Sequence, residues 1–152
     1  MTLTLKFNGK GSFCLIQNSI VTAQQTPAQD TSSYVGALMS DGTVYAGVSP
    51  DTGLGFYAAV EDAPEKLDWH EAQEYARESK AYGQNDWRLP TAGELNVMFN
   101  NRAAIGNFNA DSGFYWSSSE VSSNFARSQR FSDGNQNTLN KDIGISVRCV
   151  RG

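Results

Sequence analysis

Few side chains in this sequence are suited to covalent chemistry. His70 is the single histidine, and the two cysteines, Cys14 and Cys149, lie far apart in the chain. A catalytic histidine needs a nucleophile or a metal as its partner, and no motif nominates one. The serines at 117–119 lack the flanking glycines of a G-x-S-x-G nucleophile elbow. We therefore expect no catalytic residue and no enzymatic activity.

Metal chemistry is equally poorly supported. Asp133-Gly134-Asn135 could suggest calcium, but the D-x-[DN]-x-[DN]-G loop with its distant glutamate is missing. Two cysteines and one histidine are too few for a convincing zinc site. A type I′ hairpin turn at Asp133-Gly134 explains the tripeptide better. We expect no metal and no other cofactor.

Residues 121–145 are suited instead to noncovalent recognition. Apolar side chains alternate there with amides, hydroxyls and an arginine, and outward-pointing apolar groups would form an adhesive patch. Asn and Ser supply adaptable hydrogen bonds, whereas Phe and Arg supply anchors, as in antibody loops. The candidate ligand-binding residues are Val121, Ser123, Asn124, Phe125, Arg127, Asn137, Thr138, Leu139, Asn140, Asp142 and Ile143.

Some of these candidates have an alternative interpretation as core residues. Phe125, Ile143 and Ile145 could belong to the core side of the last strands, and Ile145 is expected there because it shares the parity of Val147 and Cys149. Exposure is expected for three of the candidates, Phe125, Arg127 and Leu139. Six residues are expected to project onto one surface: Phe125, Arg127, Asn137, Thr138, Leu139 and Asn140.

Two capping boxes predict the helices that would support this surface. Thr91 and Glu94 can each bond to the other's backbone N–H at the start of one helix, and Asp68 and Glu71 repeat the pattern upstream. The upstream helix is expected to span 69–82. Strands are expected before and after this helical region, at 34–39, 43–48 and 54–60 and again from 114 onward.

The order of strands, helix, helix and strands indicates an α+β protein with two helices packed on antiparallel sheets. The final segment, SVRCVR, is expected to be a central strand. Val147 and Cys149 should point into the core, with Arg148 and Arg151 facing the other way.

The N-terminal region differs from the rest. Residues 2–21 have the pattern of a β-hairpin, and 23–33 are polar and resemble a linker. We therefore divide the chain into an N-terminal arm with its linker, 1–33, and a ligand-binding domain, 34–152. The arm would serve attachment or oligomerisation, or it would simply add a hairpin to the main domain.

Composition limits the possible partners. The 152 residues, 39% hydrophobic and 18% charged, suit one globular domain with a weakly charged surface. A net charge of −4 argues against a nucleic-acid partner. No run approaches the roughly 20 apolar residues of a membrane span. The first residues show no secretory signal, so free thiols are favoured over a disulfide between Cys14 and Cys149.

An ordered set of motifs carries a family resemblance. WRLPT at 87–91 followed by EL, then YWSSSE at 115–120, FSDGN at 131–135 and VRCVR at 147–151 resemble the lectin-like domain at the C-terminus of collagen-like bacterial adhesins. The same domain recurs in bacterial lipoproteins, in phage structural proteins and in targets of diversity-generating retroelements. MSDGTVYAGVSPDTG with DWHEAQEYA is similar to phage-type members. The resemblance covers roughly 35–151.

This resemblance implies a C-type-lectin-like fold used for binding. The implied function is a non-enzymatic receptor- or ligand-binding module on a phage particle or, alternatively, on a bacterial cell surface. A variable protein of a diversity-generating retroelement is one form of it. The implied partners are a host-surface protein or carbohydrate and, through the N-terminal arm, other virion or surface proteins. A homo-oligomer is a further option.

Two other functions compete with this expectation. A structural virion decoration protein would need no specific ligand. The formylglycine-generating oxidases share the lectin-like scaffold, but their activity depends on a pair of cysteines that handle copper. Cys149 lies in a core-strand pattern and Cys14 in a different segment, so that match fails at the residues that matter. The Glu-Pro-Asn and Gln-Pro-Asp tripeptides with which sugar-binding C-type lectins hold calcium are also missing.

Overall fold

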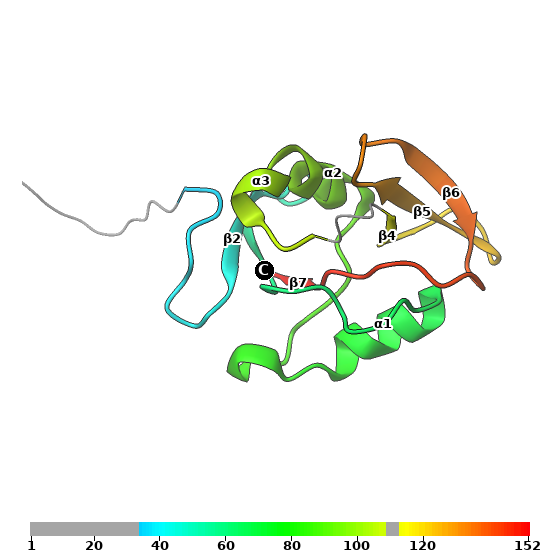
Figure 1. Cartoon of the computed structure of the whole chain (residues 1–152). Coiled ribbons are helices and arrows are strands. Elements are labelled where there is room, and N and C mark those ends of the chain that lie inside the picture. Colours follow the sequence, from blue (N-terminus) through cyan, green and yellow to red (C-terminus); the bar gives the residue numbers. More distant parts are fainter. Residues whose placement is uncertain (1–33, 109–112) are drawn as a thin grey trace, which may run out of the picture. The chain divides into compact units, whose positions relative to one another are not determined.

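The computed structural model describes residues 34–108 and 113–152, and the strands of this part form two antiparallel sheets (Figure 1). The predicted N-terminal hairpin at 2–21 and linker at 23–33 lie outside the described residues. The first sheet has the order β2-β3-β7 and the second the order β4-β5-β6. Their strands are β2 (Val44–Val48), β3 (Gly55–Ala58), β4 (Phe114–Glu120), β5 (Phe125–Arg130), β6 (Gln136–Asn140) and β7 (Val150–Arg151).

Three α-helices accompany the sheets in the described residues: α1 (Trp69–Glu78), α2 (Ala92–Asn100) and the short α3 (Arg102–Ile105). In Figure 1, α1 lies on one side of β7, and α2 and α3 lie on the other. Strands before and after a helical middle confirm the predicted α+β class.

Both predicted capping boxes are confirmed. At α1, the Glu71 N–H donates to Asp68 Oδ1 at 2.8 Å, and the Asp68 N–H donates to Glu71 Oε1 at 3.1 Å. At α2, the Glu94 N–H donates to Thr91 Oγ1 at 3.1 Å, and the Thr91 N–H donates to Glu94 Oε1 at 3.0 Å. Each pair satisfies two backbone donors that a helix start would otherwise leave unbonded.

The first helix ends earlier than predicted, at Glu78 instead of residue 82. The chain becomes extended at Ser79 and then forms a 3₁₀ turn, η2 (Ala81–Gly83), in which Tyr82 has a φ of +58°. Tertiary contacts account for this break. The Tyr82 hydroxyl accepts a hydrogen bond from the Val60 N–H at 3.1 Å, and its ring packs 5.8 Å from the ring of Trp87.

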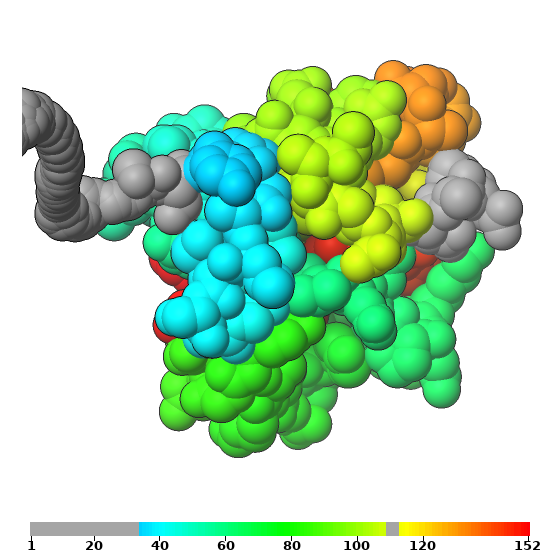
Figure 2. Space-filling view, turned by 60° about the vertical axis from the view of Figure 1, so that its left-hand side comes forward, coloured from blue at the N-terminus to red at the C-terminus, as the bar shows by residue number. Residues whose placement is uncertain are grey.

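The predicted hairpin around Asp41-Gly42 is present, but its first strand is reduced to a single bridge, Leu38↔Val44. The turn is closed by the Met39 N–H, which donates to Thr43 O at 2.7 Å. In the space-filling view, this segment is a cyan band that runs from the α3 region to the η2 region (Figure 2). At Gly42, with a φ of +96°, a Cβ atom would lie 2.8 Å from the Tyr82 ring, so the close approach requires glycine.

The β5–β6 loop does not form the predicted type I′ turn. That turn needs a positive φ at both central residues, whereas Gly134 has a φ of +83° and Asp133 is not among the positive-φ residues. A longer loop forms instead, in which the Gly134 N–H donates to Arg130 O and the Arg130 N–H donates to Asn135 O. The Phe99 ring lies against Gly134, where it would be 2.5 Å from a Cβ atom.

The described residues contain two apolar clusters. The first joins β2, β3 and α2 and includes Phe56, Leu95, Met98, Tyr115 and Phe131. The second joins α1 to the other side of β4 and β5 and includes Trp69, Trp87, Trp116, Val147 and Cys149. Trp116 is fully buried, and its Nε1–H donates to Leu67 O at 2.9 Å, so this ring is part of the scaffold.

The C-terminal segment passes between the two clusters, but only Val150–Arg151 forms a strand, β7, which stands last in the order β2-β3-β7, so the prediction that all of SVRCVR is a central strand is wrong. β3 pairs with β7 on one side, and the bridge Arg88↔Val150 lies on the other. Val147 and Cys149 face the second cluster as predicted, whereas Val150 joins the first.

Arg148 faces the other way from Val147 and Cys149, as predicted, but it does not reach solvent, because this side chain is completely buried. Its Nε–H donates to Asp62 Oδ1 at 2.9 Å, and Nη1–H donates to Ala59 O at 3.1 Å. Nη2–H donates to the carbonyls of Gly106 and Asn107, at 3.2 and 2.7 Å. The C-terminal segment is packed on both sides. Arg148, on the side opposite Val147 and Cys149, therefore contacts a carboxylate and backbone carbonyls instead of water. Such a charge is tolerated because it is paired and hydrogen-bonded.

Candidate ligand-binding face

The predicted ligand-binding residues lie on the β4-β5-β6 sheet and on the turns at one of its ends. Val121, Ser123 and Asn124 belong to the turn between β4 and β5, and Asp142 and Ile143 follow β6. All eleven are exposed except Leu139, which is half-buried.

The pairing register divides the strand residues between the two faces of the sheet. Phe125 pairs with Asn140 and Arg127 with Thr138, and directly paired residues point to the same side. These four residues, Phe125, Arg127, Thr138 and Asn140, are called the β5–β6 face below.

Two of the six residues expected on this surface lie on the opposite side. Leu139 pairs with Ala126 and Asn137 with Ser128. Side chains alternate along a strand, so consecutive residues of β6 cannot all share one face. The prediction that Leu139 is exposed is wrong, since it packs against the second apolar cluster. Asn137 is exposed but points away from the β5–β6 face.

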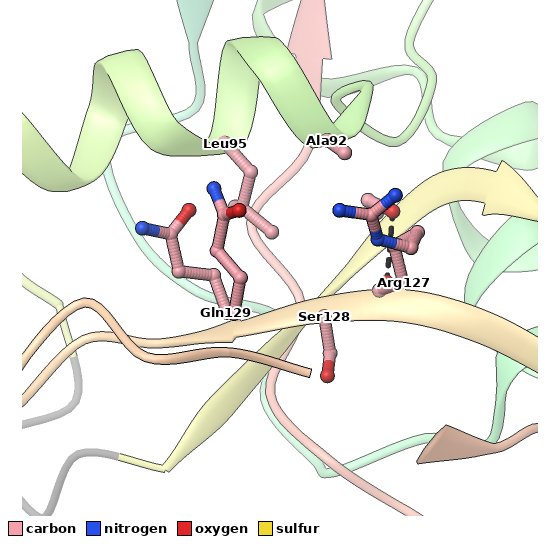
Figure 3. Close-up of a pocket in the computed structure, with 7 residues that line it drawn as sticks. Ala92, Leu95, Arg127, Ser128 and Gln129 are labelled. Carbon is pink, nitrogen blue, oxygen red and sulfur yellow. Dashed lines mark hydrogen bonds between the residues drawn. The ribbon is translucent and has the colours of Figure 1, made fainter. Parts of the chain in front are cut away.

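Helix α2 covers one end of the face and leaves the other open. Figure 3 shows Arg127 and Gln129 pointing from β5 toward α2, where Ala92 and Leu95 lie, and Ser128 pointing away. Gln129 is buried, and its Nε2–H donates to Asn96 Oδ1 at 2.9 Å. The crevice between helix and strand is too narrow to admit a water molecule. The candidate site is therefore an open surface, which suits a macromolecular partner better than a small molecule.

Large apolar side chains are exposed at the open end of the sheet. Val121 is 55% exposed, Phe125 41% and Ile143 42%. Backbone bonds hold them to the same end, because the Val121 N–H donates to Phe125 O at 2.9 Å and the Ile143 N–H donates to Asn140 O, opposite Phe125. An exposed apolar group beside polar side chains is what a binding surface requires.

Lys141 supports this end of the sheet and was missed in the sequence. Its side chain is only 3% exposed, its Nζ–H donates to Glu120 Oε2 at 2.5 Å, and Nζ lies 4.3 Å from the centroid of a Trp69 ring. Its backbone N–H donates to Asn124 O at 2.9 Å. The sequence spacing could have predicted this position: Lys141 follows Leu139 by two residues, and side chains two residues apart in a strand point to the same side.

The serine run of β4 has a structural role. The Ser117 hydroxyl donates to Arg127 O at 2.8 Å, the contact dashed in Figure 3. The Ser119 hydroxyl accepts a hydrogen bond from the Ala92 N–H at 2.9 Å. These bonds join β4 to β5 and to the first turn of α2.

The candidates for covalent chemistry lie apart from this face. Burial raises the pKa of the Cys149 thiol to about 12, so the group is protonated and a poor nucleophile at neutral pH. Cys149 forms no disulfide, and Cys14 lies outside the described residues. His70 is exposed in the first turn of α1, with its ring edge-on to Trp69.

Within residues 34–108 and 113–152, no three His, Cys, Asp or Glu side chains are placed to hold a metal ion. None of the helices in these same ranges has both the length and the apolar character to cross a membrane.

Comparison with protein families gives one match. The model of the Lcl C-terminal domain matches residues 49–151, which is more than half of the 152-residue chain. The match includes both capping boxes, all of the β4-β5-β6 sheet and all eleven candidate residues. No curated protein matches the chain.

Proposed function

The chain belongs to the Lcl C-terminal domain family, which suggests a surface or adhesin-like module, and we propose that it is a non-enzymatic module that binds a host-surface protein or carbohydrate. The module would be displayed on a phage particle or, alternatively, on a bacterial cell surface. Residues 1–33 would attach the module to other virion or surface proteins, either as a single chain or in a homo-oligomer.

The observation that carries the proposal is the β5–β6 face. Phe125 is 41% exposed on a strand whose next outward residue is Arg127, and two polar residues of β6 stand directly opposite. Part of the apolar surface of Phe125 therefore remains in water and is available to a partner. Aromatic and arginine side chains are the usual anchors of protein interfaces.

A C-type-lectin-like fold is part of the same proposal. It is supported by two main helices on opposite sides of the C-terminal segment and by a three-stranded sheet that carries the candidate residues at its open end. Exposed residues in the turn 121–124 and after β6 would be the variable positions of a retroelement target, because substitutions there disturb no core contact.

The non-enzymatic character is supported by the state of the single described thiol. Cys149 is buried and protonated, and its neighbour Arg148 is fully engaged by Asp62 and by carbonyl groups. A copper-handling pair of cysteines would need an accessible, ionisable thiol.

A structural decoration protein is the second candidate, and one observation favours it. Asn137 and Leu139 point away from the β5–β6 face, so the surface available for a ligand is smaller than the sequence suggested. A decoration protein requires no such surface.

The two candidates are distinguished by substitutions on the face. Phe125→Ala and Arg127→Ala are compared with Leu54→Ala and Arg77→Ala, which remove an exposed apolar side chain and an exposed arginine elsewhere. Binding of the labelled full chain to a panel of bacterial cells is measured, together with thermal unfolding.

A binding module predicts a loss of about 2 kcal/mol, or roughly 30-fold in affinity, for each face variant, whereas its stability should stay within about 0.5 kcal/mol of wild type. The control variants should bind as wild type does. Saturable binding that is unchanged in both face variants would exclude this face as the site, and no binding to any surface would favour the decoration protein.

A further inference from the structure

A concave site lies away from the open β5–β6 face. It is a cavity of about 280 Å³ between the turn that follows β3, the end of α1, the η2 turn and the C-terminal segment. None of the eleven candidate residues lines it. Its wall contains three aromatic side chains, Tyr75, Tyr82 and Trp87, and Cys149 is also in the lining.

The aromatic walls are held in place by their polar ends. The Tyr82 hydroxyl accepts a hydrogen bond from the Val60 N–H at 3.1 Å, and the Trp87 Nε1–H donates to Ala81 O at 3.0 Å. The two rings are 5.8 Å apart, with their planes inclined by 53°. These contacts occupy the Trp87 N–H and one acceptor site of the Tyr82 hydroxyl, so these two rings offer a ligand mainly apolar surface and the negative potential of their π faces.

The charges at the cavity are negative and only partly compensated. Asp62 lines the cavity, but its carboxylate is bound to buried Arg148 and to the Tyr115 hydroxyl. Glu61 also lines it, is exposed, and has no ion pair with any residue of the described ranges. The guanidinium of Arg148 is completely buried, so the accessible charge is the Glu61 carboxylate.

We propose that this cavity binds a small organic cation, with the ammonium group against Tyr75, Tyr82 and Trp87 and near the Glu61 carboxylate. Aromatic faces attract such cations, and this attraction strengthens when the cation is desolvated. A cavity of this size admits an alkylammonium or a trimethylammonium head group. A carboxylate at the mouth would also raise the local concentration of cations.

A sugar is the competing occupant, since sugar rings also stack on aromatic side chains. Sugar hydroxyls require several directed donors and acceptors, however, and the lining contains no Asn or Gln side chain. The Trp87 Nε1–H already donates to Ala81 O, and the Tyr82 hydroxyl already accepts a hydrogen bond from the Val60 N–H. The chemistry of the lining therefore favours a cation.

The test titrates the full chain with choline, n-butylammonium, N-acetylglucosamine and 3,3-dimethylbutan-1-ol, the neutral carbon analogue of choline. Tryptophan fluorescence and calorimetry follow binding, because Trp87 lines the cavity. We expect at least one ammonium compound to bind, and the neutral analogue to bind about fivefold or more weakly than choline or not at all. Preference for choline indicates a trimethylammonium ligand, and preference for butylammonium indicates a lysine side chain.

Two variants locate the effect. Glu61→Gln and Tyr75→Leu should each weaken binding of the ammonium compound about fivefold or more. Glu65→Gln and Tyr34→Leu change the same residue types outside the cavity lining, and each should leave the affinity for the ammonium compound within about twofold of wild type. All four positions are exposed, so the variants should fold, and a thermal melt verifies this.

Four results would overturn the proposal. Two concern the ligands: equal binding of choline and its neutral analogue, and binding of N-acetylglucosamine without binding of either cation. The other two are unchanged affinity in Glu61→Gln and Tyr75→Leu, and absence of ammonium binding at millimolar concentrations. None of these outcomes bears on the β5–β6 face, which shares no residue with the cavity.

Discussion

Replacing Arg148 by methionine tests whether this buried cation stabilises the fold. The substitution keeps a long, flexible side chain but removes the guanidinium, which donates to Asp62 and to the carbonyls of Ala59, Gly106 and Asn107. The Asp62 carboxylate, 17% exposed, would keep the Tyr115 hydroxyl as a partner but lose its counter-ion.

The expected cost follows from these contacts. Removal of one member of a buried ion pair typically destabilises a protein by about 3–5 kcal/mol, because the other charge is left uncompensated. The three carbonyl groups lose their donors as well, so the upper part of this range applies. At roughly 2–4 °C per kcal/mol for a chain of this size, Tm should fall by about 8–20 °C.

The assay is chemical and thermal unfolding of Arg148→Met, with Arg127→Met as the matched control. Arg127 is exposed and has no ion pair with the described residues, so its substitution should change stability by no more than about 0.5 kcal/mol. Adding Asp62→Asn to Arg148→Met should cost less than the sum of the two single changes, because no unpaired charge then remains.

The outcome that would refute this reasoning is a loss below about 1 kcal/mol for Arg148→Met. It would mean that Arg148 reaches solvent and that the segment is not packed on both sides. Additive effects of the two substitutions would show that Asp62 and Arg148 are not coupled.

Four further predictions address the scaffold and the absence of metal. Trp116→Ala should cost about 3–5 kcal/mol, because the ring is fully buried, and a melt within a degree of wild type would contradict this. Gly134→Ala should destabilise the protein by more than about 1 kcal/mol, and by more than the control Gly53→Ala. Both glycines have a positive φ, but only a Cβ at Gly134 would meet another side chain, that of Phe99. Equal losses of stability in the two variants would exclude this contact. Burial alone would raise the pKa of Glu94, but hydrogen bonds from Arg88 and the Thr91 N–H hold it below its ordinary value. The ionised Glu94 therefore stabilises the fold at pH values above its ordinary pKa, and this stabilisation is lost as the pH falls through the lowered pKa of the folded state. Glu94→Gln should be less stable than wild type at neutral pH. Its stability should also fall less steeply than that of wild type below about pH 5. Finally, a chelator should change neither Tm nor cell binding, and a clear drop in Tm would reveal a missed metal site.

Local signals in the sequence were reliable where one short segment determines the structure. The capping boxes at Asp68 and Thr91 place the starts of α1 and α2 because all their partners lie within four residues. The end of α1 could not be located in the same way. It depends on Tyr82, whose contacts with Val60 and Trp87 are tertiary.

The burial of Arg148 could not have been predicted from its own segment. Its acceptors come from residues 59, 62, 106 and 107, which only the completed fold brings together. The positions of Leu139 and Asn137 are a different case. Their alternation with Thr138 and Asn140 was visible in the sequence, and applying the two-residue period to β6 would have divided the predicted surface correctly.

The pairing of β5 with β6 also limits how this surface can change in evolution. A point substitution at Phe125 or Thr138 alters one outward group and leaves the inward set intact. Inserting or deleting a single residue in the loop at 131–135 would shift the register by one and exchange the two sets, which brings Leu139 outward and buries its neighbours. Lineages of this protein should therefore diversify these strands by replacement at constant length.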